Sequence, residues 1–309
     1  MRAVVYGAPR GPRGATTFSG SLGFGDVRAY LGADYQKKVY FAFAGIHGGE
    51  FEGIMGIVNL LEVLETGHDL RGKQWPDITR AAAALDRLVL LPIANVDGRA
   101  RIPVRMLRRT PNDLAASGFF NTGAWSDGSP IGWPACKQFI PLDFSRTQFP
   151  GGYPNDAGVN FQHDDFFGHR QPETEALLGL TARERPDLTL NMHTGNPFTL
   201  VYGSFIEPGL SPAFHELYTR VESRLASEKL APEKPPSADQ PSHQDVFNLE
   251  TALNLNCGTL AVLIESPDHS FSPTHTPENL LDAQLIAHQE CMRFLGETGG
   301  RYRWTPKPK

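Results

Sequence analysis

Four short and almost uninterrupted apolar runs place the strongest constraint on the fold of this 309-residue chain. They are the segments Val39–Ala44, Leu88–Ile93, Leu188–Met192 and Leu260–Ile264. Apolar runs of this length without polar alternation are typical of parallel strands that helices cover on both faces. Amphipathic stretches separate the runs, so the pattern indicates alternating strands and helices around a mostly parallel sheet.

The remaining elements extend this pattern. Helices are predicted at Phe51–Glu65, Thr174–Arg183, Pro212–Leu230 and Pro277–Phe294, and further strands at Ala3–Tyr6 and Thr199–Tyr202. At about 100–200 residues per domain, the length allows one large domain or two ordinary ones. We expect a single three-layer α/β/α domain over residues 1–309, with a mixed, mostly parallel, twisted sheet, because the candidate site residues described below come from both halves of the chain.

Glycine and proline are abundant, with 31 and 25 residues. No periodic repeat accompanies them, so they indicate loops between many short elements. Part of the excess lies in a loop-rich stretch at about residues 110–160, and another part at 232–241. Long loops in a compact domain are usually functional. We expect the first stretch to pass over one face of the sheet and to border a site.

Charge and apolar patterning exclude several classes of protein. The net charge is −5, and basic residues gather only at Arg99–Arg109, so no broad basic face for nucleic acid is expected. No apolar run approaches the 18 residues of a membrane span. The start of the chain lacks the apolar stretch of a signal peptide, and its three cysteines form no Cys-x-x-Cys motif. These features predict a cytoplasmic protein with reduced thiols.

Polar residues follow each of the four strands. They are His47 and Glu50, Asn95 and Asp97, His193, and Glu265. Ligands of open α/β sheets bind outside the carboxyl ends of the strands. Each residue alone has an ordinary explanation, such as a favourable place for Glu50 in the first turn of a helix. Together, two histidines and a carboxylate are a ligand set of catalytic zinc, and a further carboxylate suits a proton acceptor.

The segment GIHGGEFEG, at residues 45–53, resembles the metal-binding segment of the zinc carboxypeptidases. Five more segments are similar to that family in the same order, from about residue 39 to 268. They are NVDGR at 95–99, RMLRRT at 105–110, GVNFQHDDF at 158–166, PETEALLGLTARERPDLTLNMHTG at 172–195 and LIES at 263–266. The resemblance implies the zinc carboxypeptidase fold and a zinc-dependent hydrolase.

The same resemblance implies roles for particular residues. His47, Glu50 and His193 would hold one Zn²⁺ ion. Glu265 would accept a proton from the attacking water and deliver it to the leaving nitrogen, and Arg108 would polarise the substrate carbonyl. For Arg105 and Arg109, which flank Arg108, a substrate-binding role and a solvated charge cluster both remain open.

Four positions concern the substrate and differ from the family pattern or extend it. The family's Asn-Arg pair for a terminal carboxylate is Gln162-His163 here, and its Asp that orients the first zinc histidine is Asn160. A histidine lacks the permanent bidentate fork of arginine, so recognition of a free C-terminus is expected to be altered. Glu250 lies where the family lines its specificity pocket and would favour a cationic group; a helix-surface position is the alternative.

The sequence therefore predicts a zinc metallopeptidase that cleaves an amide bond and resembles metallocarboxypeptidases. Its partner would be a small peptide or an acylated amino acid. One alternative is a deacylase of N-acyl amino acids, because the form His-Gly-x-Glu-x-x-Gly also resembles the aspartoacylase and succinylglutamate desuccinylase branch. A second alternative is a metal-binding module without catalysis. The oligomeric state stays open.

Overall fold

The computed structural model describes residues 1–103, 118–132, 135–137, 141–194, 200–202, 205–230, 247–267 and 276–305, with side chains omitted at 200–202. A six-stranded sheet forms its centre, and its strands lie in the spatial order β1-β3-β2-β6-β8-β7. In that order they span Val4–Tyr6, Arg87–Leu91, Val39–Ala44, Leu188–Thr194, Leu260–Ser266 and Leu200–Tyr202.

The four central strands of this sheet are parallel. β2 pairs in parallel with β3 and with β6, and β6 pairs in parallel with β8. The edge strands β1 and β7 are antiparallel to their neighbours. The prediction of a mixed, mostly parallel sheet is therefore confirmed. The carboxyl ends of β2, β6 and β8 lie next to one another at one end of the sheet.

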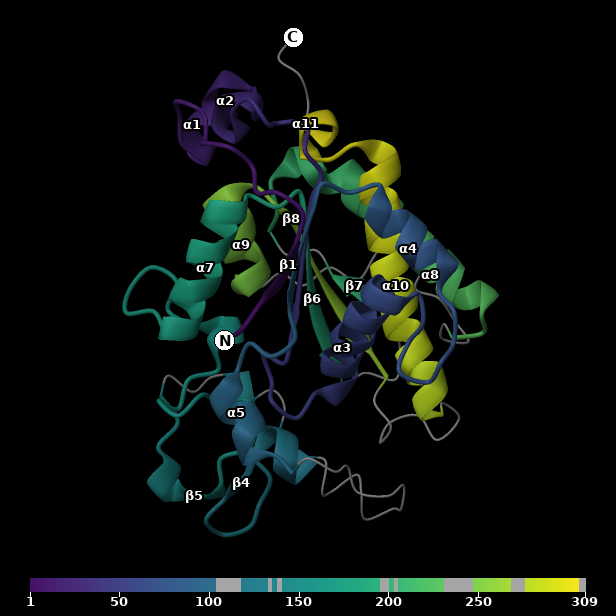
Figure 1. Ribbon diagram of the computed structural model, residues 1–309. Coiled ribbons are helices and arrows are strands. Elements are labelled where there is room, and N and C mark those ends of the chain that lie inside the picture. The colour runs from purple at the N-terminus through teal and green to yellow at the C-terminus, as the bar shows by residue number, and fades with distance from the viewer. Residues whose placement is uncertain are drawn as a thin grey trace.

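Helices cover both faces of the sheet (Figure 1). One face carries α3 (Phe51–Thr66), α4 (Pro76–Ala83), α8 (Ser211–Ser227) and α10 (Pro277–Thr298), and the other carries α7 (Pro172–Glu184) and α9 (Leu249–Cys257). Each face has its own buried apolar cluster, because successive residues of a strand point to opposite faces. In β2, for example, Tyr40 belongs to the first cluster and Phe41 to the second.

Short elements lie beyond both ends of the sheet. The end at the top of Figure 1 carries α1 (Phe18–Phe24), α2 (Arg28–Leu31) and α11 (Arg301–Trp304). The other end carries α5 (Val96–Arg101) and the two-stranded sheet of β4 (Ala124–Trp125) and β5 (Thr147–Phe149). The structure also describes four 3₁₀ helices: η1 (Ala135–Lys137), η2 (Phe144–Arg146), η3 (Phe161–His163) and η4 (Pro208–Leu210).

All six predicted strands and all four predicted helices are present; β2 has the predicted bounds, and the other elements have shifted ends. β6 and β8 are longer than expected, so that His193 and Glu265 lie inside strands and do not follow them. Helix α10 continues past the predicted end at Phe294 to Thr298 and is capped by Gly299, whose φ is 86°. Helix α9 was not predicted, because its short amphipathic pattern follows a proline-rich stretch. The loop-rich stretch at 110–160, where it is described, lies at the end of the sheet and not over its face.

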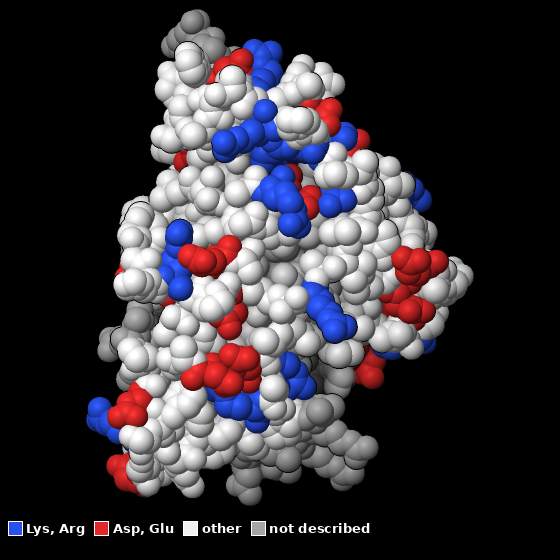
Figure 2. All heavy atoms as spheres, turned by 60° about the vertical axis from the view of Figure 1, so that its left-hand side comes forward, with Lys and Arg blue, Asp and Glu red and all other residues white. Residues whose placement is uncertain are grey.

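The surface carries both signs of charge. Figure 2 shows acidic and basic side chains side by side over one face of the molecule, with no broad area of a single sign. Within the described part of the chain, none of the helices combines the length and the apolar character that crossing a membrane would take.

Candidate metal centre

The loop that joins β2 to α3 brings His47 and Glu50 together. Its backbone packs so closely on α5 that a Cβ atom on Gly48 would lie 2.2 Å from the backbone nitrogen of Arg99. Only glycine fits such an approach, which accounts for the glycine between the two polar residues. Glu50 is the N-cap of α3, yet its side chain makes no capping hydrogen bond. Its carboxylate therefore faces the histidines and not the helix.

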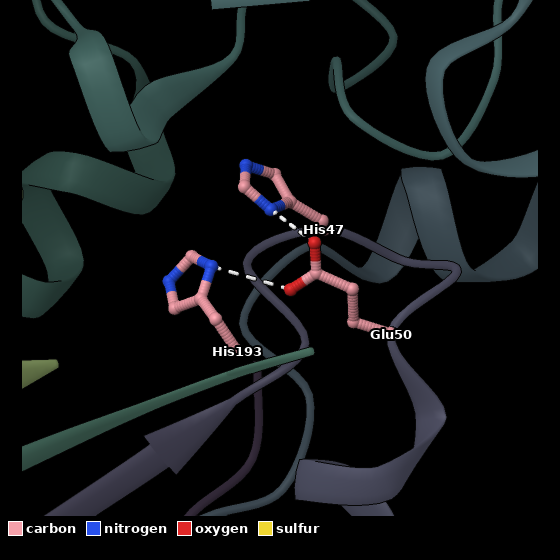
Figure 3. Close-up of side chains that lie close together, drawn as sticks. All are labelled: His47, Glu50 and His193. Atoms are coloured by element: carbon pink, nitrogen blue, oxygen red, sulfur yellow. Dashed lines mark hydrogen bonds and ion pairs between the residues drawn. The ribbon is translucent and has the colours of Figure 1, made fainter. Parts of the chain in front are cut away.

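The Glu50 carboxylate lies between two imidazole rings (Figure 3). Its Oε1 atom is 2.7 Å from His47 Nδ1, and its Oε2 atom is 3.2 Å from His193 Nδ1. Oε2 also accepts a hydrogen bond from the backbone N–H of Thr194. One ligand atom from each of the three residues lies within 4.8 Å of those of the other two, and all three side chains are buried. The predicted trio is therefore assembled from β6 and the β2–α3 loop.

Asn160 determines which nitrogen of His47 is available. Its Oδ1 atom lies 3.2 Å from His47 Nε2 and also accepts the backbone N–H of Gln162, while its Nδ2 group points to the carbonyl of Cys136. Because Oδ1 can only accept, Nε2 of the imidazole carries a hydrogen, and Nδ1, which lies 2.7 Å from Glu50 Oε1, is the nitrogen that can offer a lone pair to a cation. Asn160 thus orients a candidate metal ligand, as the hydrogen-bond partners of metal-binding histidines usually do.

Glu265 lies directly beside His193 in the sheet. The two residues are register partners on the parallel strands β6 and β8, so their side chains leave the same face. Glu265 is less buried than its strand neighbours. It is not one of the three converging ligands, but its negative charge acts on His193. Glu265 therefore lies close to the trio without being a member of it.

Burial and charge oppose each other in the cluster. Burial disfavours a charged His193, but the Glu50 and Glu265 carboxylates outweigh it and raise the pKa of His193 to about 9. Burial likewise disfavours a charged Glu50, but the two histidines lower its pKa to about 2. Burial is the main reason that the pKa of His47 is lowered. Without a metal, the Glu50 carboxylate is therefore balanced by a proton on His193.

These residues fit a divalent metal. Two nitrogen donors and a carboxylate converge on one point, and two imidazoles with one carboxylate are a ligand set of catalytic zinc. A bound cation would replace the His193 proton as the positive charge next to the Glu50 carboxylate, because histidines that bind a metal are neutral. The Nδ1 atoms of His47 and His193 already face the Glu50 carboxylate, so neither imidazole ring would have to flip to bind the metal.

Of the predicted substrate residues that the structure describes, Gln162 and Glu250 lie near this centre. Gln162 and Glu250 are buried and joined: Gln162 Nε2 donates to Glu250 Oε2 at 2.7 Å. Asn191 Nδ2 donates to Glu250 Oε1 at 2.6 Å and to Gln162 Oε1 at 3.1 Å. The charge of Glu250 also acts on His193. His163 follows Gln162 in η3 and is half-buried. Glu250 is thus enclosed and not on a helix surface.

Arg105 and Arg108, with the neighbouring Arg109, lie outside the described residues. Their predicted roles remain predictions.

Two residues of the site were not predicted. Asn191 precedes His193 by two positions in β6, so it shares its face, and strand periodicity alone could have indicated it. Tyr153 stacks on the His47 ring, with ring centroids 3.6 Å apart and planes inclined by 8°. It lies in irregular backbone, where no periodic signal exists.

Comparisons with known proteins support the fold. No family model matches the sequence, and no curated protein sequence matches it. Among solved structures, it resembles a metallo-carboxypeptidase from Burkholderia cenocepacia (TM-score 0.52, 14% identity, 95% of this chain and 60% of that chain). A metallo-carboxypeptidase from Pseudomonas aeruginosa, in complex with (2-guanidinoethylmercapto)succinic acid, gives a TM-score of 0.52 at 17% identity over 82% of this chain and 56% of that chain.

A Shewanella denitrificans protein, whose name as a carboxypeptidase A is itself inferred, gives a TM-score of 0.53 at 17% identity over 87% of this chain and 60% of that chain. The chain therefore spans 56–60% of the length of these three structures. The predicted carboxypeptidase-like fold is confirmed. At such low identity the likeness is one of fold, and the His-Glu-His group is an independent observation on this chain.

Proposed function

We propose that this protein is a zinc-dependent hydrolase of amide bonds, similar to metallocarboxypeptidases. The observation that carries the proposal is the convergence of His47 Nδ1, the Glu50 carboxylate and His193 Nδ1 at the carboxyl end of a parallel sheet. Such ends are where open α/β sheets bind their ligands. The fold shared with metallo-carboxypeptidases supports the same conclusion.

The three ligands hold one Zn²⁺ ion in this proposal. When bound, Zn²⁺ polarises a carbonyl group and lowers the pKa of water to about 7. Asn160 keeps the hydrogen of His47 on Nε2, so that Nδ1 can coordinate. The buried position of the trio excludes competing water and strengthens these interactions.

Glu265 is the proposed general base. It accepts the proton of the attacking water and delivers it to the leaving nitrogen. Its support is its position beside His193 on the neighbouring strand, with a partly exposed side chain. Arg108 is proposed to stabilise the negative charge that develops on the carbonyl oxygen, on the sequence resemblance alone. A single donor of that kind contributes about 3–4 kcal/mol to the transition state.

The substrate is proposed to be a small peptide or an acylated amino acid, with altered recognition of a terminal carboxylate. Support comes from the buried group of Gln162, Asn191 and Glu250, which holds a carboxylate and two amides close to the metal ligands. The Glu250 carboxylate of this group repels a terminal carboxylate on a substrate. This arrangement favours substrates whose end is neutral or cationic over peptides with an ordinary free C-terminus.

The test is hydrolysis by the zinc-loaded protein. Peptides with free and with amidated C-termini, peptides of D-amino acids and N-acyl amino acids form the substrate panel. Hydrolysis of any amide in the panel supports the proposal, and the preferred class separates the peptidase from the deacylase. A protein that binds zinc and cleaves none of these substrates would be the non-catalytic module.

The role of Glu265 is tested with Glu265→Gln. We expect hydrolysis to fall by about 10²–10⁴-fold, the usual contribution of a general base. Zinc binding should stay unchanged, because Glu265 is not among the converging ligands. Glu216→Gln, on the surface of α8, is the matched control and should keep full activity. Unaltered hydrolysis by Glu265→Gln would remove this residue from the mechanism.

A further inference from the structure

Tyr153 occupies a position in the metal centre to which the proposed mechanism gives no role. Its ring covers one face of the His47 imidazole, with centroids 3.6 Å apart and planes only 8° from parallel. The tyrosine is buried, at 8% exposure. A centroid separation this short leaves almost no lateral offset, so the two rings form a face-to-face stack.

Face-to-face stacking is unusual for two rings of similar electron density, which prefer offset or edge-to-face contacts. It becomes favourable when one ring is electron-poor, as in the attraction of cations to an aromatic face. Coordination to a metal withdraws electron density from an imidazole. The Tyr153–His47 stack is therefore suited to a metal-bound His47 more than to a metal-free one.

The backbone around Tyr153 is held from three sides. Its N–H donates to the carbonyl of Asn121, and its own carbonyl accepts from Asn95 Nδ2. The carbonyl of the preceding Gly152 accepts the N–H of Gly48, next to His47, at 2.8 Å. These hydrogen bonds fix the backbone of Tyr153 next to the loop that carries His47.

The other surroundings of the ring come from the segment that contains β4 and β5. Tyr153 shares a small apolar cluster with Ile131, Cys136 and Leu142, separate from the two clusters that cover the sheet. This cluster thus joins the segment beyond the end of the sheet to the first metal ligand. Packing within this segment can therefore influence the metal affinity of the centre through Tyr153.

We propose that Tyr153 is a positioning residue of the metal centre, which holds the His47 ring in plane and stabilises its metal-bound form. This inference rests on the metal site of the proposed function. Asn160 prevents rotation of the imidazole within its plane through Nε2, and Tyr153 prevents tilting out of that plane. Together, Asn160 and Tyr153 fix the direction in which His47 Nδ1 points.

The test is the zinc dissociation constant, measured by competition with a chromophoric chelator. We expect Tyr153→Leu to weaken zinc binding by about 10–100-fold, as is usual when a supporting contact of a metal ligand is removed. Tyr153→Phe keeps the stack but removes the hydroxyl that interacts with Glu50, so it should weaken zinc binding much less than Tyr153→Leu does. Phe149→Leu is the control, because it removes a stacked pair with Phe119 in the same segment. It should leave zinc affinity unchanged.

A second readout is independent of zinc. Stacking on a phenol shifts the imidazole proton signals of His47 upfield in the NMR spectrum, so Tyr153→Leu should abolish a shift that Tyr153→Phe retains. If Tyr153→Leu does not fold, Tyr153→Met fills the same space with a flexible apolar chain and replaces it in both measurements.

Two results would overturn the inference while leaving the metal centre intact. One is equal zinc affinity in Tyr153→Leu and the wild type. The other is an equal loss of affinity in Phe149→Leu, which would mean that the whole segment matters and not the stack. Absence of zinc binding by the wild type would instead remove the metal centre, and the inference with it.

Discussion

The two ends of strand β6 carry two buried charged clusters with different purposes. Asp187, just before the strand, accepts hydrogen bonds from Arg10 and from the backbone N–H groups of Val39 and Arg301. At the other end, Glu50 lies between His47 and His193. Both carboxylates are buried and paired. Burial of charge alone therefore does not distinguish a site from a structural cluster.

The two clusters differ in whether the partners of the carboxylate can give up a proton. The Asp187 carboxylate is bound by permanent donors, namely a guanidinium and backbone amides, and it connects β2, β6 and the start of α11. The partners of Glu50 are histidines, which can give up a proton and offer a lone pair instead. Only the second cluster can accept a metal ion without losing its pairing.

The largest expected effect is that of Asp187→Ala on stability. It leaves Arg10 buried without its carboxylate, and removing one partner of a buried pair costs about 3–5 kcal/mol of unfolding free energy. Urea unfolding measures the change. Asp26→Ala breaks the exposed pair with Arg28 and should cost at most about 1 kcal/mol. Unchanged zinc affinity in folded Asp187→Ala would support the separation of the two clusters.

Glu50→Gln should abolish zinc binding at the centre and change the stability of the metal-free fold only slightly. In the wild type, zinc at a thousand times its dissociation constant should raise the unfolding free energy by about 4 kcal/mol. Glu50→Gln should abolish this stabilisation. Its metal-free form should unfold near the wild type, because His193 can lose its proton when Glu50 is no longer charged. Zinc stabilisation that survives Glu50→Gln would contradict the assignment of this ligand.

The third prediction concerns His288, a buried histidine on the helix α10. His288, on α10, bonds to the Tyr40 hydroxyl through Nδ1, and burial lowers its pKa to about 3. The folded protein therefore keeps His288 neutral, whereas the unfolded chain protonates it below the ordinary histidine pKa of 6.5. The stabilising effect is complete above pH 6.5 and is lost as the pH falls toward 3.

Each pH unit within that window should cost about 1.4 kcal/mol of unfolding free energy. His288→Gln retains a polar partner for Tyr40 but does not titrate. The difference in unfolding free energy between the two proteins should therefore change with pH between 6.5 and 3 with that slope. A difference that is independent of pH would show that the buried environment of His288 does not oppose its charge.

Most of the fold was predictable, because its signals are local. The central strands are continuous apolar runs, and α3, α7, α8 and α10 carry amphipathic patterns with proline or glycine near their ends. What failed were element ends: β6 and β8 continue through His193 and Glu265. Polar residues there resemble a loop in sequence, and only the pairing of the two strands keeps them extended.

The three candidate metal ligands were predictable as a set, and their surroundings were not. His47 and Glu50 are three positions apart in one motif, and His193 follows an obvious strand. Asn160 lies 113 positions from His47, and Gln162 lies 88 positions from Glu250. Contacts of this range between irregular segments leave no periodic trace in the sequence.

The sequence by itself determined the layered sheet, the order of its central strands along the chain and the three converging ligands. These follow from hydrophobic periodicity and from the rule that parallel strands end together. The tertiary structure decided which nitrogen of His47 faces the centre, that Tyr153 stacks on its ring and that Glu250 is enclosed by Gln162 and Asn191. The physical reason is that such contacts depend on how distant loops pack, which local preferences do not encode.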